Sequence, residues 1–177
     1  GFRWARRYRS SSEGRRYLAL YRTESLNVFT SAAYKKAFEQ QTDWSLTNFK
    51  RMTNTNRRVM AVSELAGVGT GSALALVSLG SMENARRVAE MAAGVQAEMD
   101  GVLALRVLTP DPELSTPLPS EDPETRVLEP VLVIDATLEP AAAAAARLVA
   151  DELDLPDGNA TTFSLLWELR SEDLQQP

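Results

Sequence analysis

Hydrophobic and polar positions alternate in two stretches near the start of the chain. Residues 2–9 and 16–23 interleave aromatic and aliphatic side chains with arginine, which is typical of β-strands. The polar segment 10–14 separates them and suits a turn, because it consists of serine, glutamate and glycine. We therefore expect the two strands to form an antiparallel hairpin.

Capping residues after the hairpin predict two helices. Thr30 or Ser31 can cap a helix over residues 32–38, and Thr42 can cap a second, shorter one. Residues 57–65 then return to a strand pattern.

The glycine-rich segment 67–71 follows that strand. A phosphate-binding glycine loop leads from a strand into a helix, whereas another strand pattern follows here. We interpret the segment as a linker.

A longer series of elements lies beyond the linker. We expect a strand over 73–79, a helix from Ser81 to Gly101, strands over 102–108 and 131–136, an alanine-rich helix over 141–153 and a final strand over 162–169. The segment 109–130 is rich in proline and acidic residues, and we expect it to be a mobile, solvated loop.

The order of these elements suggests one structural unit written twice. Residues 72–170 follow the order strand, helix, strand, strand, helix, strand, and residues 1–66 follow it without the opening strand and helix. With the linker at 67–71 and a polar tail at 171–177, this predicts an α+β fold of tandem ferredoxin-like units. Each unit leaves one sheet face bare, so we expect the units to pack sheet to sheet as a pseudo-dimeric α+β barrel around a small chamber.

Composition narrows the chemistry. The chain has 177 residues, is 44% hydrophobic, and contains neither cysteine nor histidine. Disulfides, thiol chemistry and Ser-His-Asp catalysis are thereby excluded. No apolar run is long enough to span a membrane and no signal segment opens the chain, so we expect a cytoplasmic protein. The chain begins at Gly1 without Met, inside an apparent strand, and we expect a processed or incomplete polypeptide.

Charge is distributed unevenly. Residues 1–60 hold 13 Lys and Arg against 4 Asp and Glu, whereas residues 61–177 hold 6 against 20, which leaves a net charge of −5. A basic half can bind nucleic acid or an anionic ligand, or the two halves can attract each other across an interface. We favour the interface, and RNA binding is the least supported interpretation because the chain lacks an RNP1 pattern.

The N-terminal residues resemble a known family. Gly-Phe-Arg-Trp-Ala-Arg-Arg-Tyr-Arg at 1–9, Arg-Tyr-Leu-Ala-Leu-Tyr at 16–21, Ser-Ala-Ala-Tyr at 31–34 and Thr-Asp-Trp at 42–44 resemble EthD-like members of the dimeric α+β barrel superfamily. The resemblance is clearest over residues 1–65. It implies a barrel of two ferredoxin-like units and small-molecule chemistry without a cofactor, as in polyketide cyclases, decarboxylases and quinol monooxygenases. The helix that often carries a functional polar residue in such relatives is missing from the first unit.

One face of the hairpin is the candidate chamber wall. If Tyr8 lies opposite Tyr17, alternation places Arg6 opposite Ala19 and Trp4 opposite Tyr21. The residues expected to bind substrate are then Trp4, Arg6, Tyr8, Tyr17 and Tyr21. The candidate catalytic residues are Arg6, which could hold a carboxylate or enolate, and Tyr17 or Tyr21, which could protonate an oxyanion. Alternatively these aromatic residues fill an interface and Arg6 pairs with Glu64 or Glu24.

Two carboxylates lie within apolar strands. Asp135 and Glu168 could point inward as general bases with raised pKa values, or could point outward to solvent.

We expect no metal site and no cofactor. The leading hypothesis is a protein that binds a small apolar or aromatic molecule, with the potential to act as a cofactor-free lyase, cyclase or decarboxylase. The alternative is a non-catalytic binding or assembly protein of the same fold. A small-molecule ligand is the expected partner, a homodimer is left open, and no membrane or nucleic-acid partner is expected.

Overall fold

The computed structural model describes residues 1–12, 14–118 and 120–175. Glu13 of the predicted turn, Pro119 of the predicted loop and residues 176–177 of the tail lie outside the described residues. The elements along the chain are β1 (Phe2–Ser10), β2 (Tyr17–Thr23), the 3₁₀-helix η1 (Leu26–Thr30), α1 (Ala32–Glu39), α2 (Asp43–Phe49), β3 (Met60–Gly67), β4 (Ala73–Ser78), α3 (Met82–Glu98), β5 (Val102–Pro110), β6 (Val131–Ala136), α4 (Glu139–Glu152), β7 (Ala160–Arg170) and η2 (Ser171–Gln175).

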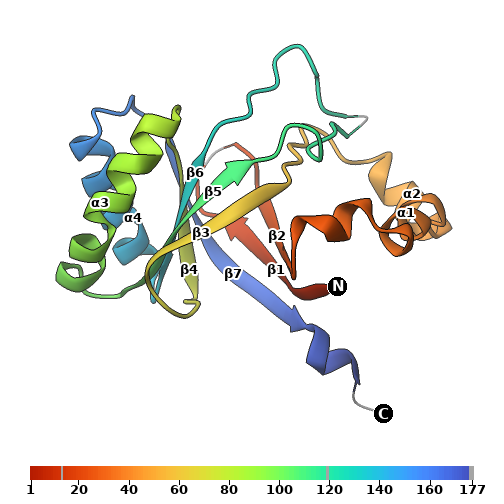
Figure 1. Cartoon of the computed structure of the whole chain (residues 1–177), viewed down its shortest axis with the longest axis horizontal. Coiled ribbons are helices and arrows are strands. Elements are labelled where there is room, and N and C mark those ends of the chain that lie inside the picture. The colour runs from red at the N-terminus through yellow and green to blue at the C-terminus, as the bar shows by residue number, and fades with distance from the viewer. Residues whose placement is uncertain (13, 119, 176–177) are drawn as a thin grey trace.

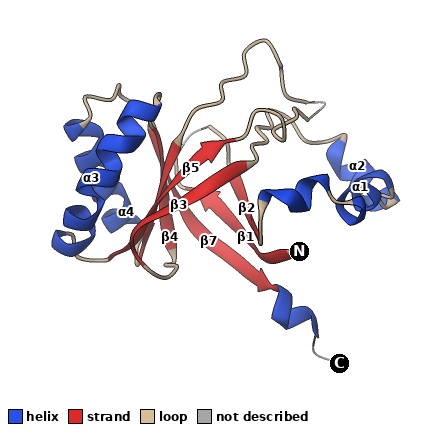
Figure 2. Cartoon of the chain, in the orientation of Figure 1, coloured by secondary structure: helices blue, strands red, loops and turns tan. Residues whose placement is uncertain are grey.

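The strands form one curled, seven-stranded sheet (Figure 1). Their order is β2-β1-β7-β4-β6-β5-β3, and every neighbouring pair is antiparallel. Helices α3 and α4 cover one face, and the edge strands curl away from them (Figure 2). We call the face opposite α3 and α4 the concave face.

The second series of elements has the predicted order. Strand β4, helix α3, strands β5 and β6, helix α4 and strand β7 follow one another, and their strands are consecutive in the sheet as β7-β4-β6-β5. The packing differs from the expected pair of facing sheets. Strands from residues 1–66 join the same sheet, with β1 and β2 beyond β7 and β3 beyond β5. The physical reason is that β7 and β5 would otherwise leave unpaired backbone groups at both edges.

Helices α3 and α4 form where capping and periodicity predict them. The Ser81 hydroxyl accepts a hydrogen bond from the Asn84 backbone amide at 3.1 Å, and Pro140 occupies the first turn of α4. Small and β-branched residues of both helices are buried against the sheet: Ala85, Val88, Ala92 and Val95 from α3, and Ala142, Ala145, Ala146 and Val149 from α4. These residues belong to the larger of the two hydrophobic core clusters, which lies between the two helices and the face of the sheet opposite the concave face.

The glycine-rich segment leads into strand β4 and not into a helix, as predicted. Gly71 lies against β6 so closely that a Cβ atom would overlap the Ala136 carbonyl oxygen. Only glycine therefore permits this crossover.

Helices α1 and α2 begin at the predicted caps but lie apart from the main core. The Ser31 hydroxyl accepts from the Tyr34 amide and the Thr42 hydroxyl from the Ser45 amide, both at 3.2 Å. Neither helix has a buried residue, and both lie at the end of the molecule away from α3 and α4 (Figure 1). An aromatic contact ties α1 to the hairpin, because the rings of Phe2 and Tyr34 stack with centroids 6.3 Å apart.

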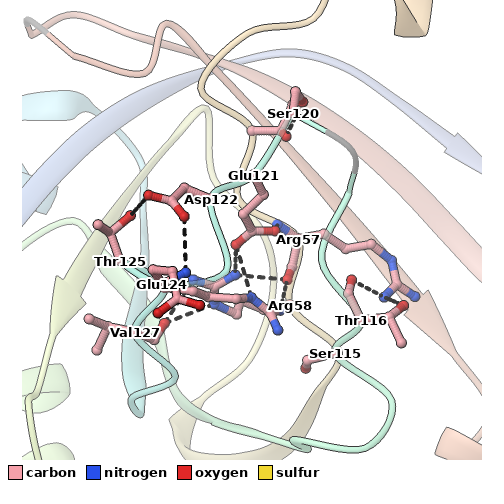
Figure 3. A network of polar contacts seen from close by, with 12 residues as sticks. Arg57, Arg58, Ser115, Thr116, Ser120, Glu121, Asp122, Glu124, Thr125 and Val127 are labelled. Carbon is pink, nitrogen blue, oxygen red and sulfur yellow. Dashed lines mark hydrogen bonds and ion pairs between the residues drawn. The ribbon is translucent and has the colours of Figure 1, made fainter.

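The loop between β5 and β6 is held in place along part of its length, which differs from the mobile loop expected from its composition. Arg58 pairs with the carboxylate of Glu121 (Figure 3), and Arg126 pairs with the same carboxylate. The buried Ser115 hydroxyl accepts from the Val59 amide at 2.9 Å and donates to the Val59 carbonyl at 3.0 Å. Arg58, which precedes β3, and Arg126 of the loop thus both neutralise Glu121, a pairing that composition alone does not reveal.

Candidate functional site

Charged side chains gather on the concave face. Arg6 of β1 lies opposite Glu168 of β7, and Arg106 of β5 lies opposite Glu64 of β3. Asp135 of β6 faces the same side, because its carboxylate pairs with Arg106. Strand pairing brings these residues side by side although they are far apart in the sequence. Alternation along each strand then turns their side chains to the same face of the sheet.

Ion pairs bridge neighbouring strands of this face. The Arg6 Nε atom lies 2.6 Å from Glu168 Oε2, and the Arg106 Nε atom lies 2.5 Å from Glu64 Oε2. Arg106 also donates to Asp135 Oδ2. Arg6 is only 8% exposed and Asp135 only 2% exposed. Removing one partner of such a pair would leave a buried charge uncompensated.

Tyr8 lies among these charges and is fully buried. Its hydroxyl makes no hydrogen bond of normal geometry among the described residues, although the Arg6 side chain lies close enough to lower its pKa. Burial, and then the negative charge of Asp135, raise the pKa of Tyr8 to about 12, although the Arg6 guanidinium acts in the opposite direction. The hydroxyl is therefore protonated at neutral pH and available as a donor.

Asp135 is the second group with an unsatisfied atom. Its Oδ2 atom accepts from Arg106, whereas its Oδ1 atom has no partner among the described residues. Burial raises the pKa of Asp135, and Arg106, Arg6 and the nearby backbone amide of Gly71 limit that rise. An unpaired buried polar atom costs about 1–3 kcal/mol, and in native proteins such atoms usually pair with a ligand or an ordered water. Asp135 and Tyr8 thus offer one acceptor and one donor on the same face.

A mostly buried apolar and aromatic cluster surrounds these polar atoms. Tyr8 packs in a cluster with Leu74, Val133 and Phe163. The guanidinium of Arg6 lies 3.8 Å from the centre of the Trp4 ring, which is the geometry of a cation–π contact. An arrangement of this kind can hold a planar molecule with a polar head.

The predicted register of the hairpin is wrong by one residue. Tyr8 lies opposite Leu18 and Arg6 opposite Leu20, not opposite Tyr17 and Ala19. The leucines face the concave cluster because they can pack against it, and a shift of one position exchanges the two faces of a strand.

Tyr17 and Tyr21 consequently face away from the site. They are 48% and 60% exposed. The Arg7 guanidinium lies 5.0 Å from the ring centre of Tyr17, and Tyr21 makes an edge contact with Phe2. Of the five predicted binding residues, the structure brings together Trp4, Arg6 and Tyr8.

The orientation of the two carboxylates, which the sequence left open, is inward for both Asp135 and Glu168. The alternative partners proposed for Arg6 are engaged elsewhere, since Glu64 pairs with Arg106 and Glu24 with the amino terminus at 2.5 Å. Sequence reasoning missed Arg106. A usable signal was present, because a single arginine interrupts an otherwise apolar strand, as Asp135 does in the neighbouring one.

Two surface hollows among the described residues lie away from this cluster. One is lined by Arg87, Met91 and Glu152 of α3 and α4, and the other lies between α4 and the start of β7. In the described ranges, no group of histidine, cysteine, aspartate or glutamate side chains is arranged to hold a metal ion. Among the residues that the structure describes, no helix has the length and apolar character needed to cross a membrane.

Comparison with known proteins returns no relative: no family model, no curated protein and no solved structure matches this chain significantly. The EthD-like resemblance therefore stays a prediction, and the function must be argued from the concave face.

Proposed function

We propose that the concave face binds a small molecule with an aromatic or apolar body and a polar head. The observation that carries this proposal is the pair of buried, unpartnered atoms, Tyr8 Oη and Asp135 Oδ1, on one face. Both atoms are covered by neighbouring side chains, so a ligand must displace part of that cover; a ligand that then accepts from Tyr8 and donates to Asp135 would satisfy both. Carbonyl compounds with a neighbouring hydroxyl group, such as phenolic ketones and acids, have this pattern.

The same groups support cofactor-free proton transfer as the chemistry of the site. Asp135, held by Arg106, is the base, and its raised pKa suits the removal of a proton. Tyr8 and Arg6 stabilise the oxyanion that forms. Cyclisation, decarboxylation and other lyase reactions all pass through such an anion. Tyr8, and not Tyr17 or Tyr21, is therefore the proposed hydroxyl donor to the oxyanion, because Tyr8 lies on the same face as Arg6.

The chain is organised, under this proposal, as two repeats of one ferredoxin-like unit, of which the first is incomplete. The order β1, β2, a helical segment and β3 repeats the order β5, β6, α4 and β7, which supports a truncated ferredoxin-like unit at 1–66 beside a complete one at 72–170. This interpretation would make the curled sheet part of a pseudo-dimeric α+β barrel.

The alternative is a non-catalytic binding or assembly protein. Exposed apolar side chains on and near α1 and α2 favour it: Phe38, Trp44, Leu46, Phe49 and Met52. Large exposed apolar side chains concentrated in one short stretch of a chain are typical of protein interfaces.

The binding test uses salicylate and its methyl ester as probes, because both place an acceptor beside a hydroxyl group. Calorimetry should show that Tyr8→Phe and Asp135→Asn each weaken binding at least tenfold, as expected when a buried hydrogen bond of about 1.4 kcal/mol or more is lost. Tyr17→Phe is the matched control, because Tyr17 lies on the opposite face. Equal affinity of the Tyr8→Phe and Tyr17→Phe variants would refute the proposal. Mass spectrometry of the purified protein identifies any molecule that remains bound.

A further inference from the structure

The two edges of the sheet face each other across an opening. Strands β2 and β3 are the terminal strands of the sheet, so each has one side without a strand neighbour among the described residues. The side chains of Arg22 on β2 and Glu64 on β3 meet across the opening, with 3.5 Å between Arg22 Nη1 and Glu64 Oε1. At the other end, Arg15 in the β1–β2 turn donates to the Asn54 carbonyl at 2.9 Å.

The contact between Arg22 and Glu64 fits an opening one strand wide. Arg22 and Glu64 reach each other only through the tips of long side chains. Two strands that flank a third lie about 9.5 Å apart, a distance that such a pair can bridge. Strand direction leads to the same conclusion. Six successive antiparallel pairs separate β2 from β3, so these two edges run in the same direction. One strand antiparallel to both would complete an even, fully antiparallel barrel.

We propose that the opening between β2 and β3, which we call the seam, binds a single extended peptide strand that runs antiparallel to both edges. This is strand addition at a sheet edge, here on two sides at once. The proposal does not depend on the ligand proposed for the concave face. It predicts that an occupied seam would shield that face from solvent.

The side chains along the seam define the chemistry of the peptide. Strand alternation turns two apolar side chains and one charged side chain of each edge toward the concave side: Leu18, Leu20 and Arg22 on β2, and Met60, Val62 and Glu64 on β3. The four apolar side chains are half-buried. A strand running the opposite way meets Arg22 and Glu64 first. Its inward residues are therefore one polar residue followed by two apolar residues, at every second position.

An edge strand of a second copy of this chain does not fit the seam. A strand between β2 and β3 has both of its sides engaged, so it cannot belong to another sheet at the same time. The edge strands of a second copy are each already paired on one side, β2 with β1 and β3 with β5. The occupant is therefore a segment that is free on both sides.

The test uses a synthetic peptide of the sequence Lys-Thr-Asn-Thr-Val-Thr-Val-Thr-Lys with blocked ends, and hydrogen exchange of the whole protein measured by NMR. We expect the peptide to slow exchange of backbone amides at least tenfold in both β2 and β3. A control peptide of the same sequence with alternate backbone nitrogens methylated should lose protection at the edge that those nitrogens face, because it lacks donors for that edge. Protection of one edge only by the unmethylated peptide, equal protection by the methylated peptide, or no protection at millimolar peptide would each overturn the proposal. Protection that rises with protein concentration alone would also overturn it and identify a second copy as the occupant.

Cross-linking provides a second measurement that does not depend on exchange rates. The chain contains no cysteine, so Val62→Cys introduces a unique thiol on the concave side of the seam and Ser63→Cys introduces one on the other side. A peptide with cysteine in place of its first valine, activated as a mixed disulfide with thionitrobenzoate, should exchange with the thiol of the Val62→Cys protein and release thionitrobenzoate at least tenfold faster than with the Ser63→Cys protein. Equal rates would contradict the predicted orientation of the strand.

Discussion

Replacing Arg106 by leucine tests the electrostatics of the concave face most severely. Arg106 pairs with Asp135, which is buried, and with Glu64, whose side chain is about half exposed. Breaking a buried pair by removing one partner costs about 3–5 kcal/mol. We expect about 3 kcal/mol, because only Asp135 is left without water and Glu64 can be solvated. For a chain of this length, that loss corresponds to a decrease in melting temperature of about 6–12 °C.

The pH dependence identifies Asp135 as the cause of the loss. Burial raises its pKa above the ordinary value of 3.8, and the loss of Arg106 raises it further. A group whose pKa is raised in the folded state favours folding below its unfolded pKa, and this contribution is lost as pH rises through the folded pKa. The difference in unfolding free energy between wild type and Arg106→Leu should therefore be small below pH 3.8 and should grow toward neutral pH.

Urea denaturation at several pH values measures this difference. The matched control is Arg86→Leu, because Arg86 forms an exposed pair with Glu83 at 2.8 Å and should change stability by less than about 0.5 kcal/mol. Adding Asp135→Asn to Arg106→Leu should restore at least half of the loss. A loss at neutral pH no larger than that of the control, or additive effects of the two substitutions, would refute the reasoning.

The other predictions concern single groups. Glu121→Gln should weaken the loss of stability in acid, because hydrogen bonds from Arg58, the Arg57 backbone and Arg126 outweigh burial and hold the pKa of Glu121 below its usual 4.5. The stability it provides is present above that value and lost as pH falls, and urea titration at several pH values measures it. Without ligand, Tyr8→Phe should leave stability unchanged or raise it by about 1 kcal/mol, since it removes an unpaired buried hydroxyl; a marked loss would show that the hydroxyl has a partner. Gly94→Ala should stabilise α3 by about 0.5–1 kcal/mol because its Cβ would meet open space, whereas Gly71→Ala should prevent a cooperative thermal transition, and similar melting temperatures for the two variants would contradict the close approach of Gly71 to β6.

Patterning predicted the elements of this chain more reliably than their pairing. The periodicity and caps of α3 and the hairpin sequence in β1 and β2 are local signals, and the structure contains the expected elements. The register of the hairpin depends on which residues of β2 pack against the apolar cluster. Leu18 and Leu20 do so, whereas Tyr17 and Tyr21 lie on the other face. The expectation of two facing sheets did not include edge pairing, which joins β1 to β7 and β3 to β5.

The candidate site could be predicted only in part for the same reason. Trp4, Arg6 and Tyr8 share a face because alternation within one strand is a local property. Asp135 and Glu168 stood out as carboxylates in apolar strands, but their inward orientation depends on the partners Arg106 and Arg6, which lie 29 and 162 residues away in sequence. No periodicity links residues at such separations.

The most direct test of the concave site is NMR of protein labelled at the tyrosine Cζ carbon. The chain contains four tyrosines, so each resonance can be assigned by substitution and followed during pH titration and addition of methyl salicylate. We predict that Tyr8 titrates with a pKa of about 12 and that its resonance moves on addition of the probe while those of Tyr17 and Tyr21 stay in place. A Tyr8 resonance that titrates at the ordinary value of 10.0 and does not respond to the probe would contradict the account.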